Sequence, residues 1–242
     1  MYMITTATSA EVARATPTVA VLPVGSFEQH GDHLPLATDT LVAQAIAHAI
    51  SDAYGLLLLP PITISCSHEH SAWLGTVSIS SATLASIIRD VVASLQRSGI
   101  HALLLVNGHG GNYVLSNVVQ EANIDQPVMS LFPSRYDWDA ARAGAGLETT
   151  THDDMHAGEL ETSILLHAYP QVARTGYESA DHDSGPRPHL LVYGMKAYTT
   201  SGVIGRPSAA SPQKGKLLID GLVSLAVGHL HALGMETDRQ DR

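Results

Sequence analysis

Residues 102–112 read ALLLVNGHGGN, and this stretch decides the fold class. Its first five residues form an unbroken apolar run, which is typical of a strand buried on both faces of a parallel sheet. An amphipathic stripe with helical spacing precedes it over residues 82–98, a second helical segment follows over residues 114–119, and another apolar run fills residues 128–132. This alternation predicts parallel βαβ units with helices on both faces of the sheet.

The rest of the chain continues the alternation. Apolar runs predict strands at residues 19–24 and 56–59, and helical spacing predicts helices over residues 41–50, 156–169 and 215–233. Two segments lack periodicity: residues 137–154 are expected to form a mobile loop, and residues 177–214 a lid or an oligomer contact. The length of 242 residues fits a single α/β domain spanning residues 1–242.

The charge and cysteine content exclude several classes of partner and site. Thirteen basic residues stand against 23 acidic ones, for a net charge of -10, and there is no stripe rich in Lys and Arg. Nucleic acids and anionic membranes are therefore not expected as partners. Cys66 is the only cysteine, so any metal must be held by nitrogen and oxygen. Because no signal-peptide pattern or membrane-spanning apolar run is present, we expect a cytoplasmic protein.

Polar side chains follow two of the predicted strands at the point where each strand ends. Residues 26–39, SFEQHGDHLPLATD, follow the first strand and carry Glu28, His30 and Asp39, while His109 follows the central strand. Because the carboxyl ends of parallel strands meet at one edge of a sheet, these side chains are expected to lie together. A dinuclear metal site needs about three ligands per ion and one carboxylate that reaches both ions. The alternative interpretation is a pair of ordinary solvated loops.

A third polar cluster lies further along the chain and contains six ionisable side chains. These are His152, Asp153, Asp154, His156, Glu159 and Glu161. If a helix begins at His156, then His156 and Glu159 share a face three residues apart, as His and Glu do in the di-metal sites of helical bundles. The alternative is a capped helix whose first acids complement the helix dipole.

A fourth cluster, SCSHEHSAW, occupies residues 65–73. Ser67 and Glu69 are interpreted as groups that contact substrate or support the metal ligands. His70 fits a structural hydrogen-bonding role equally well. The ligands proposed in the other clusters already suffice for two ions.

Three ordered motifs resemble the creatininase (creatinine amidohydrolase) family: GSFEQHGDHLPLATD, NGHGGN and HAGELETS. The resemblance implies a three-layer α/β/α sandwich with a mostly parallel central sheet, and two divalent metal ions per chain. Zn, Mn and Fe all accept such mixed His and carboxylate ligands. It also implies hydrolysis of a C–N bond in a small-molecule amide substrate, and a homo-oligomer, often a hexamer.

The resemblance also assigns roles to individual residues. Glu28, Asp39 and His109 are implied to hold one ion, and His30 with bridging Asp39 the other. His156 is implied to contact substrate and to transfer protons as the catalytic histidine. Asp153 and Ser67 match further substrate contacts.

Two positions depart from the creatininase pattern. The family enzyme has an acid where this chain has Gly111, which leaves the second ion one ligand short, and we hypothesise that Glu159 supplies it. The tryptophan that packs on creatinine is replaced by His152, so creatinine is a disfavoured substrate.

The expected function is that of a dinuclear metal-dependent amidohydrolase that cleaves a cyclic amide, formamide or similar C–N bond with metal-activated water. One alternative is a peptidase or deformylase step in cofactor biosynthesis. Another is a catalytically idle, metal-stabilised binding subunit. Phosphoester cleavage is disfavoured because few cationic side chains are available to clamp a phosphate.

Overall fold

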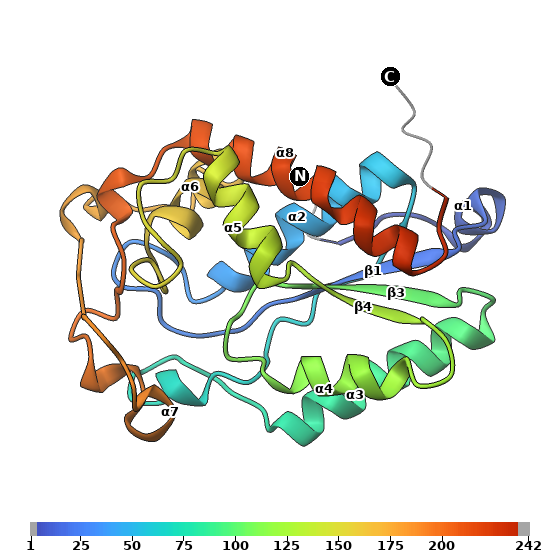
Figure 1. Cartoon of the computed structure of the whole chain (residues 1–242), viewed down its shortest axis with the longest axis horizontal. Helices are drawn as coiled ribbons and strands as arrows, with labels where there is room; N and C mark the ends of the chain where they lie inside the picture. Colours follow the sequence, from blue (N-terminus) through green and yellow to red (C-terminus); the bar gives the residue numbers. More distant parts are fainter. Residues whose placement is uncertain (1–3, 237–242) are drawn as a thin grey trace.

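The centre of the molecule is a four-stranded, entirely parallel sheet, seen in a computed structural model that describes residues 4–236. Its strand order is β2-β1-β3-β4 (Figure 1). The strands are β1 (Val19–Val24), β2 (Leu57–Leu58), β3 (Ala102–Asn107) and β4 (Met129–Phe132). All four strand predictions are confirmed, although β2 is shorter than its apolar run.

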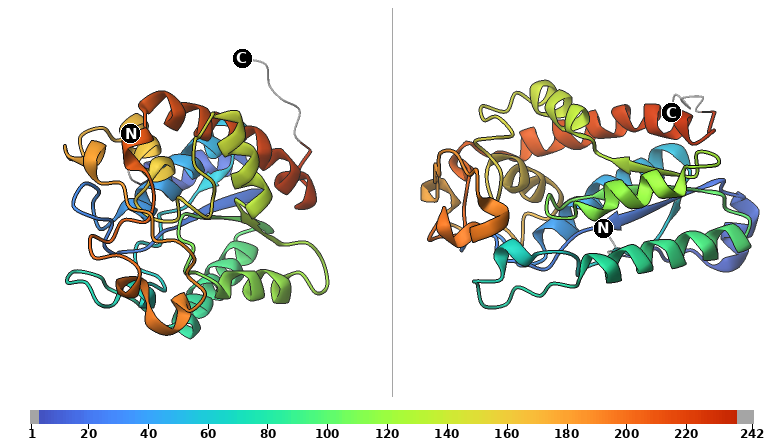
Figure 2. Two further views of the ribbon diagram at one scale, coloured as in Figure 1. Left: turned by 60° about the vertical axis from the view of Figure 1, so that its left-hand side comes forward. Right: turned by 60° about the horizontal axis from the view of Figure 1, so that its bottom comes forward.

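Helices cover both faces of the sheet, as the alternation predicted (Figures 1 and 2). One face carries α2 (Thr38–Tyr54), α5 (Arg135–Gly144), α6 (Glu159–Ala168) and α8 (Pro212–Ala232), and the other carries α3 (Ser81–Arg97) and α4 (Val114–Ala122). Side chains along β1 alternate between the two layers: Val19 and Val21 join the first core, whereas Ala20 and Leu22 join the second. The three-layer α/β/α sandwich is thereby confirmed.

The remaining elements are short. They are α1 (Ser9–Ala15), η1 (His68–His70), η2 (Tyr177–Ser179), α7 (Leu190–Tyr193), η3 (Met195–Ala197) and η4 (Pro207–Ala209). The segment 177–214, for which a lid or an oligomer contact was expected, is tied to the rest of the domain by an isolated bridge of Ile204 with His156. A second bridge, His182 with Gly205, lies within the segment. No helix among residues 4–236 is long and apolar enough to cross a membrane.

The expected mobile loop over residues 137–154 is wrong, because its first half is the helix α5. The Ser134 hydroxyl accepts a hydrogen bond from the Asp137 amide, and the Asp137 carboxylate accepts one from the Ser134 amide. This capping box starts the helix, and the following alanines favour its continuation despite Gly144.

The helix α6 begins at Glu159 rather than at His156. Ala157 has a left-handed backbone with φ of 54°, and Gly158 is the N-cap residue, so the chain cannot be helical before Glu159. The backbone of His156 instead forms a bridge with Ile204. The predicted helical face shared by His156 and Glu159 is therefore wrong.

A close backbone approach joins the two loops that follow β1 and β3. A Cβ atom on Gly108 would lie 2.4 Å from the carbonyl oxygen of Asp39, so only glycine lets the NGH loop touch the first turn of α2. His109 is thereby brought against Asp39 at the carboxyl edge of the sheet.

Candidate metal centre

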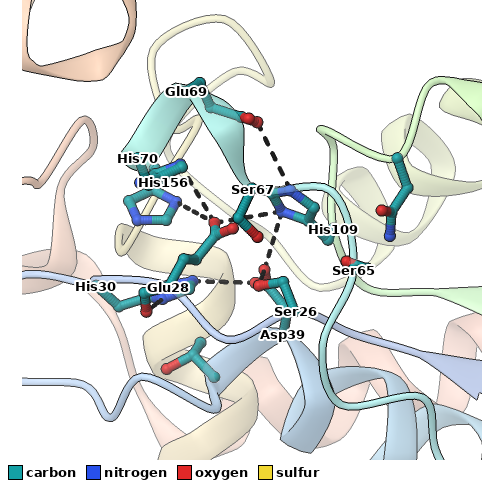
Figure 3. A network of polar contacts seen from close by, with 12 residues as sticks. Ser26, Glu28, His30, Asp39, Ser65, Ser67, Glu69, His70, His109 and His156 are labelled. Atoms are coloured by element: carbon teal, nitrogen blue, oxygen red, sulfur yellow. Dashed lines mark hydrogen bonds and ion pairs between the residues drawn. The ribbon is translucent and has the colours of Figure 1, made fainter. Parts of the chain in front are cut away.

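Four of the predicted metal ligands meet in one buried cluster (Figure 3). Glu28 and His30 come from the loop after β1, Asp39 from the first turn of α2, and His109 from the loop after β3. All four are at most 5% exposed, although two of them, Glu28 and Asp39, are carboxylates. Such residues are almost never buried unless paired or bound to metal.

The ligand atoms form two groups that share Asp39. Glu28, Asp39 and His109 make one group, and His30, Asp39 and Glu161 make the other. A third candidate group, Glu28, His30 and His156, does not include Asp39. Within each group, the candidate ligand atoms lie within 4.8 Å of one another. Asp39 turns its Oδ2 atom toward His109 Nδ1 and its Oδ1 atom toward His30 Nε2, each at 3.0 Å. A hydrogen bond from the Ser26 hydroxyl to Oδ2 holds the carboxylate in this orientation.

Glu28 provides the strongest sign that a cation belongs here. Both of its carboxylate oxygens are buried, and neither accepts a hydrogen bond within the part of the chain that the structure describes. Ring nitrogens of His70 and His109 lie 3.2 Å from its Oε1 atom. A buried carboxylate without donors is costly, whereas a divalent ion placed between carboxylate oxygens and imidazole nitrogens would satisfy both. The donor set therefore fits a metal.

Backbone carbonyls direct the histidine ring nitrogens toward the cluster. His109 Nε2 lies 2.8 Å from the Cys66 carbonyl oxygen and His30 Nδ1 lies 3.0 Å from the Glu28 carbonyl oxygen, so each of these nitrogens donates. This is the usual way in which a metal-binding histidine is held in the required tautomer. Burial lowers the pKa of both rings, but the neighbouring carboxylates outweigh it and raise the pKa to about 9 for His30 and well above its usual range for His109. In metal-free protein the opposite nitrogen of each ring therefore carries a proton directed at the carboxylates, and this nitrogen would offer its lone pair to a metal that replaces the proton.

The predicted catalytic residue His156 also lies in the cluster. Its Nε2 atom lies 2.6 Å from the Gln29 carbonyl oxygen and donates to it, which leaves Nδ1 directed at Glu28 Oε1, 3.8 Å away. Burial lowers the pKa of His156 well below its usual range, and His30 and His70 lower it further. The ring is therefore neutral at pH 7 and is able to accept a proton at Nδ1.

Glu159, hypothesised as the last metal ligand, lies elsewhere. Its carboxylate accepts hydrogen bonds from the amide and hydroxyl groups of Thr149, from the Glu148 amide and from Lys214 Nζ at 2.6 Å. Those acceptors are already occupied, and Glu159 belongs to none of the candidate metal groups among the described residues. The hypothesis assumed a helix that begins at His156. Because α6 begins at Glu159 instead, the side chain of Glu159 points away from the site and that of Glu161 points toward it.

Asp153 is also separated from the centre. It is exposed, and its carboxylate accepts a hydrogen bond from the Thr150 hydroxyl. Its neighbour Asp154 is buried instead, with its carboxylate on the first amides of α6. The expected contact between Asp153 and substrate therefore finds no support in its position.

The fourth cluster contributes three side chains around the centre (Figure 3). Ser67 is fully buried, and its hydroxyl has no hydrogen-bond partner among the described residues. His70 is held by the Gln29 side-chain amide, 2.9 Å from its Nδ1 atom, and faces Glu28. Sequence reasoning left His70 undecided because nothing local pairs it with Glu28, 42 positions before it.

Glu69 occupies the space opened by Gly111. A Cβ atom on Gly111 would lie 2.1 Å from Glu69 Oε1 and 2.4 Å from His109 Nε2. Glu69 Oε1 itself lies 3.6 Å from His109 Nε2. The position that lacks the expected acid is therefore filled in space by an acid from another loop.

A cavity of about 250 Å³ opens beside the centre. The ligand candidates His109 and Glu161 line it, and Trp138, Leu160 and Val42 provide apolar wall. Arg142 and Asp154 line it as well. The cavity offers a water-poor space in which a small molecule can reach the metal ligands.

Known proteins resemble this chain over nearly its whole length. A family model described as Creatininase, creatinine amidohydrolase, matches residues 5–230. The mycofactocin precursor peptide peptidase of Mycobacterium ulcerans (strain Agy99) is 33% identical over 242 residues, covering 93% of this chain and 89% of that protein. The creatinine amidohydrolase of Pseudomonas putida is 27% identical and covers 84% of each chain. The manganese form of creatininase superposes with a TM-score of 0.76 at 25% identity, covering 92% of this chain and 93% of that chain.

The matched region includes every loop and helix that carries the buried cluster. Ligand geometry and similarity to a manganese enzyme together indicate that the cluster binds divalent metal ions.

Proposed function

Since the chain belongs to the creatininase family of metal-dependent amidohydrolases, we propose that it holds two divalent ions and uses them to hydrolyse the C–N bond of a small amide. The observation that carries this proposal is the division of Asp39 between two ligand groups, with one carboxylate oxygen directed to each. One shared carboxylate between two sets of three ligands is the arrangement expected of a dinuclear hydrolase.

The proposed ligands are Glu28, Asp39 and His109 for one ion, and His30, Asp39 and Glu161 for the other. When bound, such ions supply an activated water at neutral pH and polarise the carbonyl of an amide. The choice of Zn, Mn or Fe is not fixed by this mixed donor set.

We assign proton transfer to His156. Its neutral ring, held by the Gln29 carbonyl, directs Nδ1 toward Glu28, so it is placed to accept a proton from water and to return it to the leaving nitrogen. The unpartnered hydroxyl of Ser67 is the proposed hydrogen-bonding group for the substrate amide. Both side chains are buried, which keeps competing water away from the reacting groups.

Creatinine itself remains disfavoured as the substrate. The residue at the tryptophan position, His152, is exposed, and its backbone carbonyl accepts a hydrogen bond from Arg187. A short peptide is the second candidate, because the relative that is 33% identical is a precursor-peptide peptidase. We also propose, from family resemblance, a cytoplasmic homo-oligomer such as a hexamer.

Metal analysis and a substrate panel test the proposal together. Protein purified without chelators should contain about two divalent ions per chain, and it should hydrolyse at least one member of a panel of cyclic amides, formamides and short peptides. Chelation should abolish turnover, and Zn²⁺ or Mn²⁺ should restore it. Glu121→Gln, which removes an exposed acid on α4, serves as the control and should keep both properties. Full activity in metal-free protein would refute the proposal.

A further inference from the structure

Arg142 is a buried cation with unused hydrogen-bonding capacity. It lies in the last turn of α5 and is only 6% exposed. Its Nη2 atom donates to the Thr149 carbonyl and hydroxyl, to the Thr150 carbonyl and to Asp154 Oδ2. All the hydrogen bonds that Arg142 donates within residues 4–236 leave from this one nitrogen. A guanidinium has five N–H donors, so three of them have no protein acceptor.

One of these unused donors is fully shielded. The Nε atom is buried and has no hydrogen-bond partner among the described residues. Leaving a buried donor unpaired is costly, and more so for a charged group. The hydrogen bonds that hold the loop over residues 149–154 account for the burial of Nη2, but they do not account for the burial of Nε.

Arg142 is part of the wall of the cavity beside the metal centre. Arg142 lines this cavity together with His109 and Glu161, and it is the only Arg or Lys among the described residues that do so. Asp154, which pairs with Nη2 of Arg142, also accepts hydrogen bonds from the amides of Glu159 and Leu160, so its oxygens are occupied and do not serve Nε or Nη1.

We propose that Arg142 forms a subsite for a carboxylate carried by the amide substrate. A carboxylate is planar and offers two oxygens, which matches the planar fork of a guanidinium better than a neutral amide does. The amide to be cleaved would lie at the inner end of the cavity near His109 and Glu161, with its carboxylate at Arg142. The subsite rests on the proposed hydrolase function, which it narrows to acidic amides.

A matched pair of ligands tests the subsite without requiring turnover. N-acetylglycine and N-acetylglycinamide differ only in carboxylate against carboxamide, and their dissociation constants for the metal-loaded protein are measured by titration calorimetry. The wild type should bind the acid about tenfold or more tightly than the amide, because a charge-assisted pair forms only with the acid. Arg142→Gln should reduce this ratio to near one, while binding of N-acetylglycinamide changes little.

Arg135→Gln is the control, because it removes a charge from the same helix at an exposed site. It should keep the wild-type ratio. An unchanged ratio in Arg142→Gln would place the carboxylate on the metals and overturn the subsite, as would equal binding of both ligands by the wild type. Inorganic phosphate that binds through Arg142 when N-acetylglycine does not would overturn the carboxylate assignment.

If Arg142→Gln fails to fold, a crystal structure of the wild type with N-acetylglycine tests whether Arg142 binds the carboxylate. Carboxylate oxygens on Nε or Nη1 of Arg142 support the subsite, and contact with the metals alone or with water in that place contradicts it. Since these measurements report binding and not turnover, loss of the subsite leaves the proposed function standing. If the wild type prefers N-acetylglycine through Arg142 but cleaves no amide, the proposed function is refuted and the subsite stands.

Discussion

Glu159 and Glu161 stand two residues apart in the first turn of α6, yet their carboxylates lie in opposite surroundings. Burial raises the pKa of Glu159, but hydrogen bonds from Lys214, Thr149 and the Glu148 amide outweigh it and hold the pKa below 4.5. Burial raises the pKa of Glu161 to about 8, although His30 opposes the rise. Glu159 is paired with Lys214, whereas Glu161 lies among the candidate metal ligands, with its Oε1 atom 3.9 Å from His30 Nε2.

This difference teaches how to recognise a metal ligand among several buried acids. About 200° separates the two side chains around the helix axis, so only one of them is able to face the centre. The useful criterion is whether the carboxylate oxygens are already satisfied by protein donors. Both oxygens of Glu159 accept hydrogen bonds from protein donors, whereas Glu161 accepts one, from the Ala157 amide at Oε2, and its Oε1 atom lies 3.9 Å from His30 Nε2. Both acids appear equally suitable in the motif HAGELETS.

The largest effect on metal content and turnover is expected from a substitution of Asp39, which the proposed metal role of Glu161 requires as a shared ligand. Asp39→Asn removes the negative charge shared by both ligand groups, so metal content should fall well below two ions per chain. Turnover should drop by about 10³-fold or more. Elemental analysis and steady-state kinetics measure both effects. Two retained ions with wild-type turnover would show that Asp39 is not the shared ligand.

Matched substitutions at the two glutamates test the comparison directly. Glu161→Gln should remove about one ion per chain and lower turnover by about 10²-fold or more, because one ligand group loses its second carboxylate. Glu159→Gln should keep the full metal content. Elemental analysis of both variants gives the answer, and the reverse pattern would restore Glu159 as the ligand.

The cost of Glu159→Gln should appear in stability instead. Its carboxylate is fully buried and its partner Lys214 is largely so, and loss of one member of a buried ion pair leaves the other uncompensated. The free energy of unfolding should fall by about 2–3 kcal/mol, as measured by denaturant titration. In the double variant with Lys214→Met, part of this loss should be recovered. Additive losses would mean that the two side chains do not depend on one another.

In metal-free protein, Glu159 and Glu161 should change the free energy of unfolding in opposite directions as the pH rises. The depressed pKa of Glu159 gives stability that is present above pH 4.5 and lost as the pH falls through its folded value. The raised pKa of Glu161 disfavours folding progressively as the pH rises from 4.5 to about 8.

Metal-free Glu161→Gln should therefore be more stable than the wild type at pH 8 by about 1–3 kcal/mol, and nearly equal to it at pH 4. Melting temperatures of both proteins across this range measure the effect. A constant difference at all pH values would mean that Glu161 does not titrate in the folded chain.

The local sequence pattern was sufficient to predict the strands of the sheet and part of the candidate metal centre. The apolar runs at residues 19–24 and 102–106 specified adjacent parallel strands, and chain direction then placed the polar loops after them at one edge. Glu28, Asp39 and His109 were predictable because each follows its strand closely or opens the next helix.

The remainder depended on contacts that local sequence does not reveal. The left-handed backbone of Ala157 shifts the start of α6 by three residues, and nothing in its side chain indicates that conformation. Lys214, whose ammonium group pairs with the Glu159 carboxylate, lies 55 positions further along the chain. The interpretation of residues 137–154 as a loop also concealed Arg142, since a side chain on an assumed mobile loop has no defined position.

The shared space of Gly111 and Glu69 makes these two positions evolutionarily interdependent. An acid introduced at position 111 alone would collide with Glu69, and removal of Glu69 alone would leave a gap beside His109. Each single step is therefore expected to be unfavourable. The double exchange also requires a shift, because the same Cβ atom would lie 2.4 Å from His109 Nε2 and 2.9 Å from the Cys66 carbonyl oxygen. Such epistasis would keep Gly111 and Glu69 together in chains of this kind.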